Sequence, residues 1–229
     1  SKNNLEGIDV VVYSSAIGDD NVELSEAKNR GLLLIKRAEL LGVIASGYKT
    51  VVSVAGSHGK TTACAMISEI IMNAKMKPTI HVGGVLTKIG SNHKIGSKKI
   101  FVTESCEYKD NFLFLKPDIS VILNIDADHL DYFGSLDGVK GSFLKFAKNT
   151  KVGGINIVCY DDESSKELLS QENTVSFGFN KGADIYACKI KEYKPCYYSF
   201  DVVFFGYKLG NIKLNIIGKH NVLNALAAT

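Results

Sequence analysis

A segment that begins at residue 56 has the residue types of a phosphate-binding loop. It reads Gly56-Ser57-His58-Gly59-Lys60-Thr61-Thr62 and lies between an apolar run, 51–55, and apolar residues at helical spacing over 63–74. Backbone N–H groups at a helix N-terminus bind anions, the Lys60 ammonium adds positive charge, and the Thr61 hydroxyl is a ligand for Mg²⁺. We therefore expect this loop to bind the phosphates of a nucleotide.

The loop is shorter than the full pattern of nucleoside-triphosphate-binding loops. That pattern, G-x-x-x-x-G-K-[ST], requires glycine where this chain has Val54, so the match is G-x-x-G-K-T-T. A glycine turn with an incidental exposed lysine is the alternative interpretation. The expected strand before the loop and the amphipathic helix after it favour phosphate binding.

Further ligand types follow two other strands of the expected sheet. Glu104 ends the strand 100–103, and His129 lies in a polar cluster, 124–131, after the strand 119–123. Ligands of parallel sheets bind at the carboxyl ends of strands. We expect Glu104 to ligate Mg²⁺ and His129 to ligate a metal or donate to a developing charge, at adjacent strand ends. A surface carboxylate and a structural histidine are the alternatives.

Other polar residues near these positions have plainer interpretations. Glu107 and Asp110 lie in the loop after Glu104 and could assist it, but we expect them to be solvated loop carboxylates, and we expect Cys106 to pack. Asn221 and Asn224 open the last expected helix, where asparagine is a common N-cap.

The composition is that of an ordinary globular chain. Its 229 residues are 45% hydrophobic and 22% charged, and the net charge of +3 is too small to indicate a nucleic-acid partner. The sequence has neither a signal-peptide pattern nor an apolar run of membrane-spanning length. The five cysteines are odd in number and widely spaced, which indicates reduced thiols in a cytoplasm.

Alternating strands and helices predict an α/β fold with a doubly wound, mostly parallel sheet. The expected strands are 8–13, 32–35, 51–55, 78–82, 100–103, 119–123, 155–159 and 174–177, and the expected helices are 23–30, 37–45, 63–74, 135–149, 164–170 and 220–229. Period-two alternation over 186–216 predicts a small antiparallel sheet near the C-terminus. The first two β-α units lack partner strands, and we interpret them as the end of a separate domain, with a boundary at Gly47.

Four ordered motifs resemble the Mur ligase family, and the likeness runs nearly end to end. They are 56–62, Glu104-Ser105-Cys106-Glu107-Tyr108, Asn124-Ile125-Asp126-Ala127-Asp128-His129-Leu130-Asp131 and Gly218-Lys219-His220-Asn221-Val222-Leu223-Asn224-Ala225. Two earlier segments, Ser14-Ser15-Ala16-Ile17 and Lys36-Arg37-Ala38-Glu39, add to the resemblance.

The resemblance implies a three-domain, ATP- and Mg²⁺-dependent ligase of peptidoglycan precursor synthesis in the bacterial cytoplasm. Residues 1–47 would be the C-terminal part of the UDP-binding domain, and 48–229 the central ATP-binding domain, truncated at its end. The complete enzyme would join L-alanine to the carboxylate of UDP-N-acetylmuramate through an acyl phosphate, without nucleic-acid or membrane partners. This fragment alone is expected to be inactive.

The family motifs also imply residue roles. Lys60 would hold the β- and γ-phosphates, Thr61 the first Mg²⁺, and Glu104 and His129 the second metal. The other implied nucleotide contacts are Gly56, Ser57, His58, Gly59, Thr62, His220 and Asn224, the last two at adenine.

Three points stay open in this interpretation. Many relatives have Asp-Glu-Ser-Asp where this chain has Cys106-Glu107-Tyr108-Lys109, which leaves the role of Glu107 undetermined. A sister ligase that attaches a recycled peptide to the same sugar nucleotide would share every motif. A non-catalytic ATP-binding fragment is the alternative from another functional class.

Overall fold

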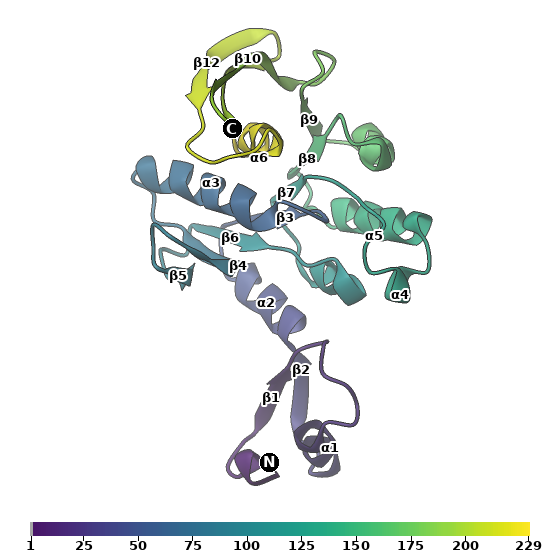
Figure 1. Cartoon of the computed structure of the whole chain (residues 1–229). Coiled ribbons are helices and arrows are strands. Elements are labelled where there is room, and N and C mark those ends of the chain that lie inside the picture. Colours follow the sequence, from purple (N-terminus) through teal and green to yellow (C-terminus); the bar gives the residue numbers. More distant parts are fainter. Residues whose placement is uncertain (1) are drawn as a thin grey trace.

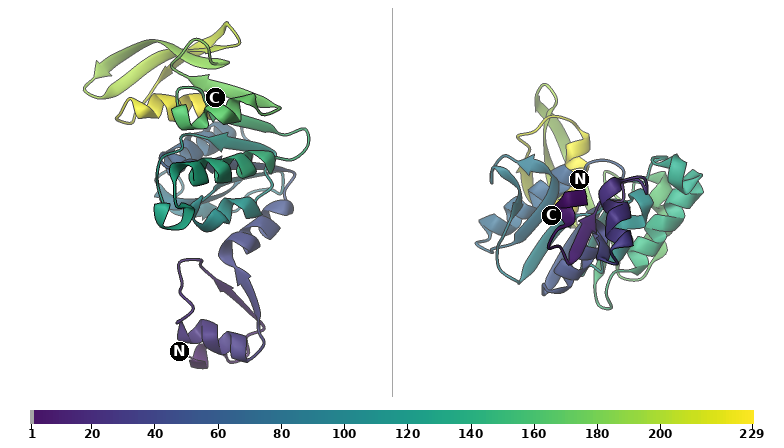
Figure 2. Two further views of the ribbon diagram at one scale, coloured as in Figure 1. Left: turned by 90° about the vertical axis from the view of Figure 1, so that its right-hand side faces the viewer. Right: turned by 90° about the horizontal axis from the view of Figure 1, so that it is seen from below.

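The structure, a computed structural model, describes residues 2–229, with the backbone alone for residues 2 and 3. Figure 1 shows a small N-terminal unit that projects from a large sheet, with helix α2 (Arg37–Ser46) between the two. The left-hand view of Figure 2 shows the same separation. The phosphate-loop segment follows an interior strand of the large sheet, β3 (Thr50–Ala55).

The N-terminal unit is a two-stranded parallel sheet with two short helical elements. Its elements are η1 (Lys2–Leu5), β1 (Val10–Tyr13), α1 (Val22–Asn29) and β2 (Leu33–Lys36). Val10 pairs with Leu33, and these two side chains are 44% and 58% exposed. Two strands therefore leave much of their apolar surface in water, because each has only the other as its sheet partner.

The large sheet has ten strands, in the order β12-β11-β10-β9-β8-β7-β3-β6-β4-β5. The seven strands from β10 to β4 in this order run parallel, whereas β5, β11 and β12 run antiparallel to their neighbours. The strands are β3 (Thr50–Ala55), β4 (Thr79–Leu86), β5 (Ser91–Lys94), β6 (Ile100–Glu104), β7 (Ile119–Ile122), β8 (Ile155–Cys159), β9 (Thr174–Gly178), β10 (Ile185–Lys194), β11 (Tyr197–Phe204) and β12 (Tyr207–Lys213).

Helical elements cover both faces of this sheet. Along β3, Val52 and Val54 face the core formed with α3 (Lys60–Asn73) and α6 (His220–Ala228). The intervening residues face the opposite layer, which explains why the strand is apolar on both faces apart from the buried Ser53. That layer contains α2, η2 (Tyr108–Phe114), α5 (Leu136–Lys148) and η3 (Glu163–Ser170), and the short helix α4 (Leu130–Phe133) precedes α5.

The predicted doubly wound, mostly parallel sheet is confirmed, with three differences in detail. The antiparallel strands β10–β12 extend the main sheet, because Ile185 of β10 pairs with Phe177 of β9. Strand β5 lies in a polar segment where no strand was expected. The segment 163–170 forms a 3-10 helix where a helix over 164–170 was expected.

Two further observations concern the cysteines and the helices. All five cysteines are free thiols, in keeping with the expectation from their spacing. Among the described residues, none of the helices combines the length and the apolar character needed to cross a membrane.

Candidate nucleotide-binding site

The backbone between β3 and α3 has a conformation that requires glycine. Gly56 and Gly59 have φ angles of 143° and 86°, a region that L-residues rarely adopt. A Cβ at Gly56 would also lie 3.1 Å from the Cβ of Leu123. Helix α3 starts at Lys60 without a side-chain N-cap, so the loop leaves the first N–H groups of the helix open to a ligand.

The segment after β7 holds this loop in place. The side-chain amide of Asn124 accepts from the His58 N–H at 2.8 Å and donates to the His58 carbonyl at 3.0 Å. The Ser57 hydroxyl accepts from the Asp126 N–H at 2.9 Å, and the His58 ring lies 3.3 Å from the Asp126 carboxylate. Ser57 and His58 therefore fix the loop to the end of β7, a role that their place in the motif did not reveal.

The Lys60 ammonium lies at the mouth of the loop, paired with a buried carboxylate. It donates to the Gly56 carbonyl at 2.5 Å and to the two carboxylate oxygens of Glu107 at 3.0 and 3.2 Å. Glu107 is only 2% exposed, so the expectation of a solvated loop carboxylate is wrong. The chain after β6 folds back toward the loop, and a carboxylate buried there needs a cation beside it.

Glu107 also belongs to a cluster of groups that could hold a metal ion. One ligand atom each from Glu107, Asp128 and His129 lies within 4.8 Å of the other two. The His129 ring lies against the Tyr108 ring, with centroids 4.7 Å apart. Sequence reasoning selected His129 but missed Glu107 as its neighbour.

Glu104 ends β6, on the other side of β3 from β7, the strand that precedes Asp128 and His129. Strands β6 and β7 both border β3, which lies between them, so the expectation that their ends are adjacent is wrong. The Glu104 carboxylate accepts from the Gly83 N–H at 3.0 Å. Glu104 nevertheless lines the same pocket as Lys60.

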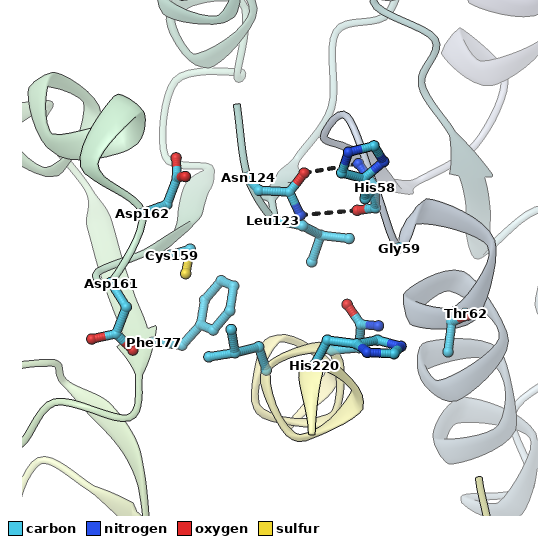
Figure 3. Close-up of a pocket in the computed structure, with 12 residues that line it drawn as sticks. His58, Gly59, Thr62, Leu123, Asn124, Cys159, Asp161, Asp162, Phe177 and His220 are labelled. Carbon is cyan, nitrogen blue, oxygen red and sulfur yellow. Dashed lines mark hydrogen bonds between the residues drawn. The ribbon is translucent and has the colours of Figure 1, made fainter. Parts of the chain in front are cut away.

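A pocket of about 610 Å³ opens beside the loop, between the ends of β7, β8 and β9 and helix α6. Figure 3 shows His58 and His220 on opposite sides of this pocket. Its lining residues are His58, Gly59, Thr62, Leu123, Asn124, Cys159, Asp161, Asp162, Phe177, His220, Leu223 and Asn224. The loop and the start of α6, which lie far apart in the sequence, are thus brought to one cavity.

Asn224 packs directly against the loop. A Cβ at Gly59 would lie 2.7 Å from the Asn224 side-chain oxygen. The Asn224 amide donates to Asn221 at 2.9 Å, and the Asn221 amide donates to the Ile217 carbonyl at 2.7 Å. Because α6 begins at His220, neither asparagine is its N-cap, and the capping interpretation is wrong. The two amides instead brace the start of α6, and the Asn224 side chain lies against Gly59 of the loop.

The far wall of the pocket contains polar groups that are already engaged by the fold. Asp162 accepts from the Ile125 N–H at 3.2 Å, and burial raises the pKa of its carboxyl. Asp161 accepts from the Asn180 N–H at 3.3 Å. Burial raises the pKa of the Cys159 thiol to about 11, so the thiol stays protonated at neutral pH. This wall shapes the pocket. Cys159 ends β8, and Asp161 and Asp162 come just after it, which is the one sequence signal that could have identified them.

A second pocket, of about 390 Å³, lies between α2 and the ends of β4 and β6. Its polar lining includes Arg37, Lys60, His81 and Glu104, and its apolar side comes from α2. Burial lowers the pKa of His81, and the charge of Arg37 adds to this effect. Cys106 also lines this pocket and is exposed, contrary to the expectation that it packs.

Comparisons with known proteins agree with this geometry. The profile of the Mur ligase middle domain matches residues 54–229, and that of the Mur ligase family catalytic domain matches residues 1–49. The chain is 46% identical over 224 residues to UDP-N-acetylmuramate–L-alanine ligase of Caldanaerobacter subterraneus, covering 97% of this chain and 49% of the relative. It is 44% identical over 229 residues to the ligase of that name from Clostridium beijerinckii, covering 99% and 50%.

Solved structures give the same answer at the level of the fold. The UDP-N-acetylmuramate-alanine ligase of Thermotoga maritima superposes with a TM-score of 0.86 at 27% identity, covering 100% of this chain and 51% of that chain. A Neisseria UDP-N-acetylmuramate:L-alanyl-gamma-D-glutamyl-meso-diaminopimelate ligase superposes with a TM-score of 0.87 at 24% identity, covering 99% and 74%. The chain spans about half the length of the curated relatives it matches. On the family profiles, the phosphate loop and this fold, the chain belongs to the Mur ligase family.

Proposed function

We propose that this chain is the ATP-handling part of a ligase that joins L-alanine to the carboxylate of UDP-N-acetylmuramate in the cytoplasm. The observation that carries the proposal is the phosphate loop, held by Asn124 and opening on a pocket that Asn224 and His220 close from α6. Relatives of 44% and 46% identity have the name of this ligase. Residues 48–229 form the ATP-binding domain in this proposal, and residues 1–47 belong to the UDP-binding domain.

The pocket beside the loop suits a nucleoside in size and in chemistry. Its walls are apolar at Leu123, Phe177 and Leu223, and polar groups of His220 and Asn224 lie at one side. A purine base buried there would leave its phosphates directed at the loop and the first turn of α3. Lys60, at the mouth of the loop, would then exchange its contact with Glu107 for the β- and γ-phosphates.

Most of the candidate ligands at the loop carry the oxygen donors that Mg²⁺ prefers, namely the Thr61 hydroxyl and the carboxylates of Glu104, Glu107 and Asp128, and His129 adds a ring nitrogen. A Cβ at Gly84 would lie 3.2 Å from the Thr61 methyl group, so glycine lets β4 approach the start of α3. Thr61 and Glu104 would hold the ion that accompanies the phosphates, and His129, with Glu107 next to it, a second one. Bound Mg²⁺ neutralises phosphate charge and lowers the cost of carboxylate attack.

The chain's own residues would prepare the first half-reaction. The helix N-terminus, Lys60 and the loop N–H groups orient the γ-phosphate, and the carboxylate oxygen of the sugar nucleotide attacks its phosphorus while ADP leaves. The resulting acyl phosphate is then attacked by the amine of L-alanine, which releases phosphate and a proton. A sister ligase that adds a peptide in this second step would share the same half-reaction, and the relatives of higher identity favour L-alanine.

Titration calorimetry with Mg²⁺-ATP tests the nucleotide site on the chain itself. We expect Lys60→Ala to weaken binding about 10- to 100-fold, because charge-assisted hydrogen bonds to phosphate are lost. Lys116→Ala is the matched control, since Lys116 is an exposed lysine outside both pockets. Equal affinity of wild type and Lys60→Ala would overturn the loop assignment.

A ligase assay tests the rest of the proposal. A protein of the relatives' full length that contains this chain should form the amide from UDP-N-acetylmuramate and L-alanine with release of ADP and phosphate. Turnover of a tripeptide but not L-alanine would instead show the sister activity. Residues 1–229 alone are expected to bind Mg²⁺-ATP without forming the amide, because closure around the nucleotide completes the catalytic set.

A further inference from the structure

The five residues 107–111, here called the junction segment, touch both the phosphate loop and the N-terminal unit. At one end, Glu107 pairs with Lys60. At the other, the Lys109 ammonium donates to the Ser15 carbonyl at 2.7 Å, and the Asn111 amide donates to the Ser15 hydroxyl at 2.8 Å. The segment therefore connects the turn after β1 to the mouth of the phosphate loop within five residues.

The backbone of the junction segment is held in an unusual conformation. Lys109 and Asp110 have φ angles of 52° and 58°, and neither is glycine. Such conformations persist where surrounding contacts enforce them. Asp110 is held by hydrogen bonds from Ser142 and, at 2.9 Å, from the Tyr132 hydroxyl. The contacts of Lys109 and Asn111 with Ser15 supply the constraint on the other side.

We propose that Lys109 and Asn111 are positioning residues that use the Ser15 turn to hold Glu107 against Lys60. The proposal deepens the proposed function, since Lys60 is its phosphate-binding lysine. The contact of Ser15 with the junction segment would then link the N-terminal unit, where the sugar nucleotide would bind, to the position of the Glu107 carboxylate at the ATP site. When the contacts with Ser15 are lost, the junction segment relaxes and the Glu107–Lys60 ion pair is broken more often. The Lys60 amine is then more accessible to solvent.

Acetylation of Lys60 by an amine-reactive ester, followed by peptide mass spectrometry, measures this coupling without any nucleotide. We expect Ser15→Ala, Asn111→Ala and Lys109→Ala each to raise the acetylation rate of Lys60 about twofold to fivefold, as the share of molecules with the ion pair intact falls. Lys109→Arg, which keeps a cationic donor for the Ser15 carbonyl, should restore the wild-type rate. Lys116→Ala should leave it unchanged.

The Ser15 variant is the decisive one, because it alters no residue of the central domain. Its effect should not add to that of Asn111→Ala, since both remove the same hydrogen bond. An unchanged Lys60 rate in Ser15→Ala and in Lys109→Ala/Asn111→Ala, with wild-type melting temperatures, would overturn the proposal. A rate that rises only in variants with a lowered melting temperature would also overturn it.

A second arm separates this proposal from that of the nucleotide site. Mg²⁺-ATP should protect Lys60 of the wild type from acetylation. Failure of that protection would count against ATP binding, whereas the nucleotide-free comparison of the variants would still decide the role of the junction segment.

Discussion

Asn124 forms two hydrogen bonds with one residue of the phosphate loop, accepting from the His58 N–H and donating to the His58 carbonyl. Through this pair, the end of β7 fixes the position of a loop that follows β3. We expect Asn124→Ala to lower the free energy of unfolding by about 1–2 kcal/mol, because two hydrogen bonds are lost. Mg²⁺-ATP affinity should fall about tenfold, because the loop N–H groups are no longer pre-positioned.

Denaturant unfolding and calorimetry measure both effects, with Asn92→Ala on β5 as the control. Asn92 is an exposed residue of an edge strand and contacts neither pocket. Wild-type affinity in Asn124→Ala would show that the loop keeps its shape without this amide.

Gly59→Ala tests the contact between the loop and α6. A methyl group there would meet Asn224, and the φ of 86° adds backbone strain of about 1–2 kcal/mol. We expect a loss of unfolding free energy of at least that size, together with weaker Mg²⁺-ATP binding. Combining Gly59→Ala with Asn224→Ala should recover the steric part and leave the backbone part. If the losses of unfolding free energy in the two single variants simply add in the double variant, the two residues do not touch.

The pH dependence of stability should contain a contribution from His81. Burial places the folded-state pKa of this ring below its ordinary value of 6.5. The unfolded chain therefore takes up the proton first as the pH falls, and stability is lost from about pH 6.5 down through the folded-state pKa. His81→Gln should flatten the dependence of the urea midpoint on pH over this range. An unchanged slope would assign the pH dependence to other groups.

The N-terminal unit should exchange its amide hydrogens faster than the large sheet. Strands β1 and β2 have only each other as partners and expose Val10 and Leu33. Strand β3 lies between two neighbours and is buried on both faces. Mass spectrometry should find 10–13 and 33–36 exchanged at times when 51–55 is still protected. Equal protection of the two regions would contradict this account.

Much of the fold could be predicted because local pattern and global structure agree. The apolar run before Gly56, the glycines of the loop and the amphipathic segment after it specify β3, the loop and α3 without any tertiary information. Strand β5 was missed because its sequence, Ser91-Asn92-His93-Lys94, lacks apolar residues. The strand also pairs along one edge only, with β4. Its strand conformation depends on β4, which a local pattern does not show.

The candidate site could be predicted only as far as strand ends identify it. Lys60, Thr61, Glu104 and His129 could be selected because they lie at or after the carboxyl ends of β3, β6 and β7. Glu107 was missed, because its burial depends on the return of the junction segment toward Lys60. The flanking residues Tyr108 and Lys109 suggest a solvated loop. The backbone at Lys109 is left-handed, and a lysine gives no sequence cue to that conformation, as a glycine, asparagine or aspartate would.

The position of β5 and β12 at the two borders of the large sheet also affects self-association. A border strand presents unpaired backbone groups, onto which a second molecule could add a strand and begin an aggregate. Here β5 is short and polar, and β12 contains Lys208 and Lys213. A further copy of either strand, added in register, would place like charges side by side. The same two strands that complete the ten-stranded sheet thus discourage its growth into a fibre.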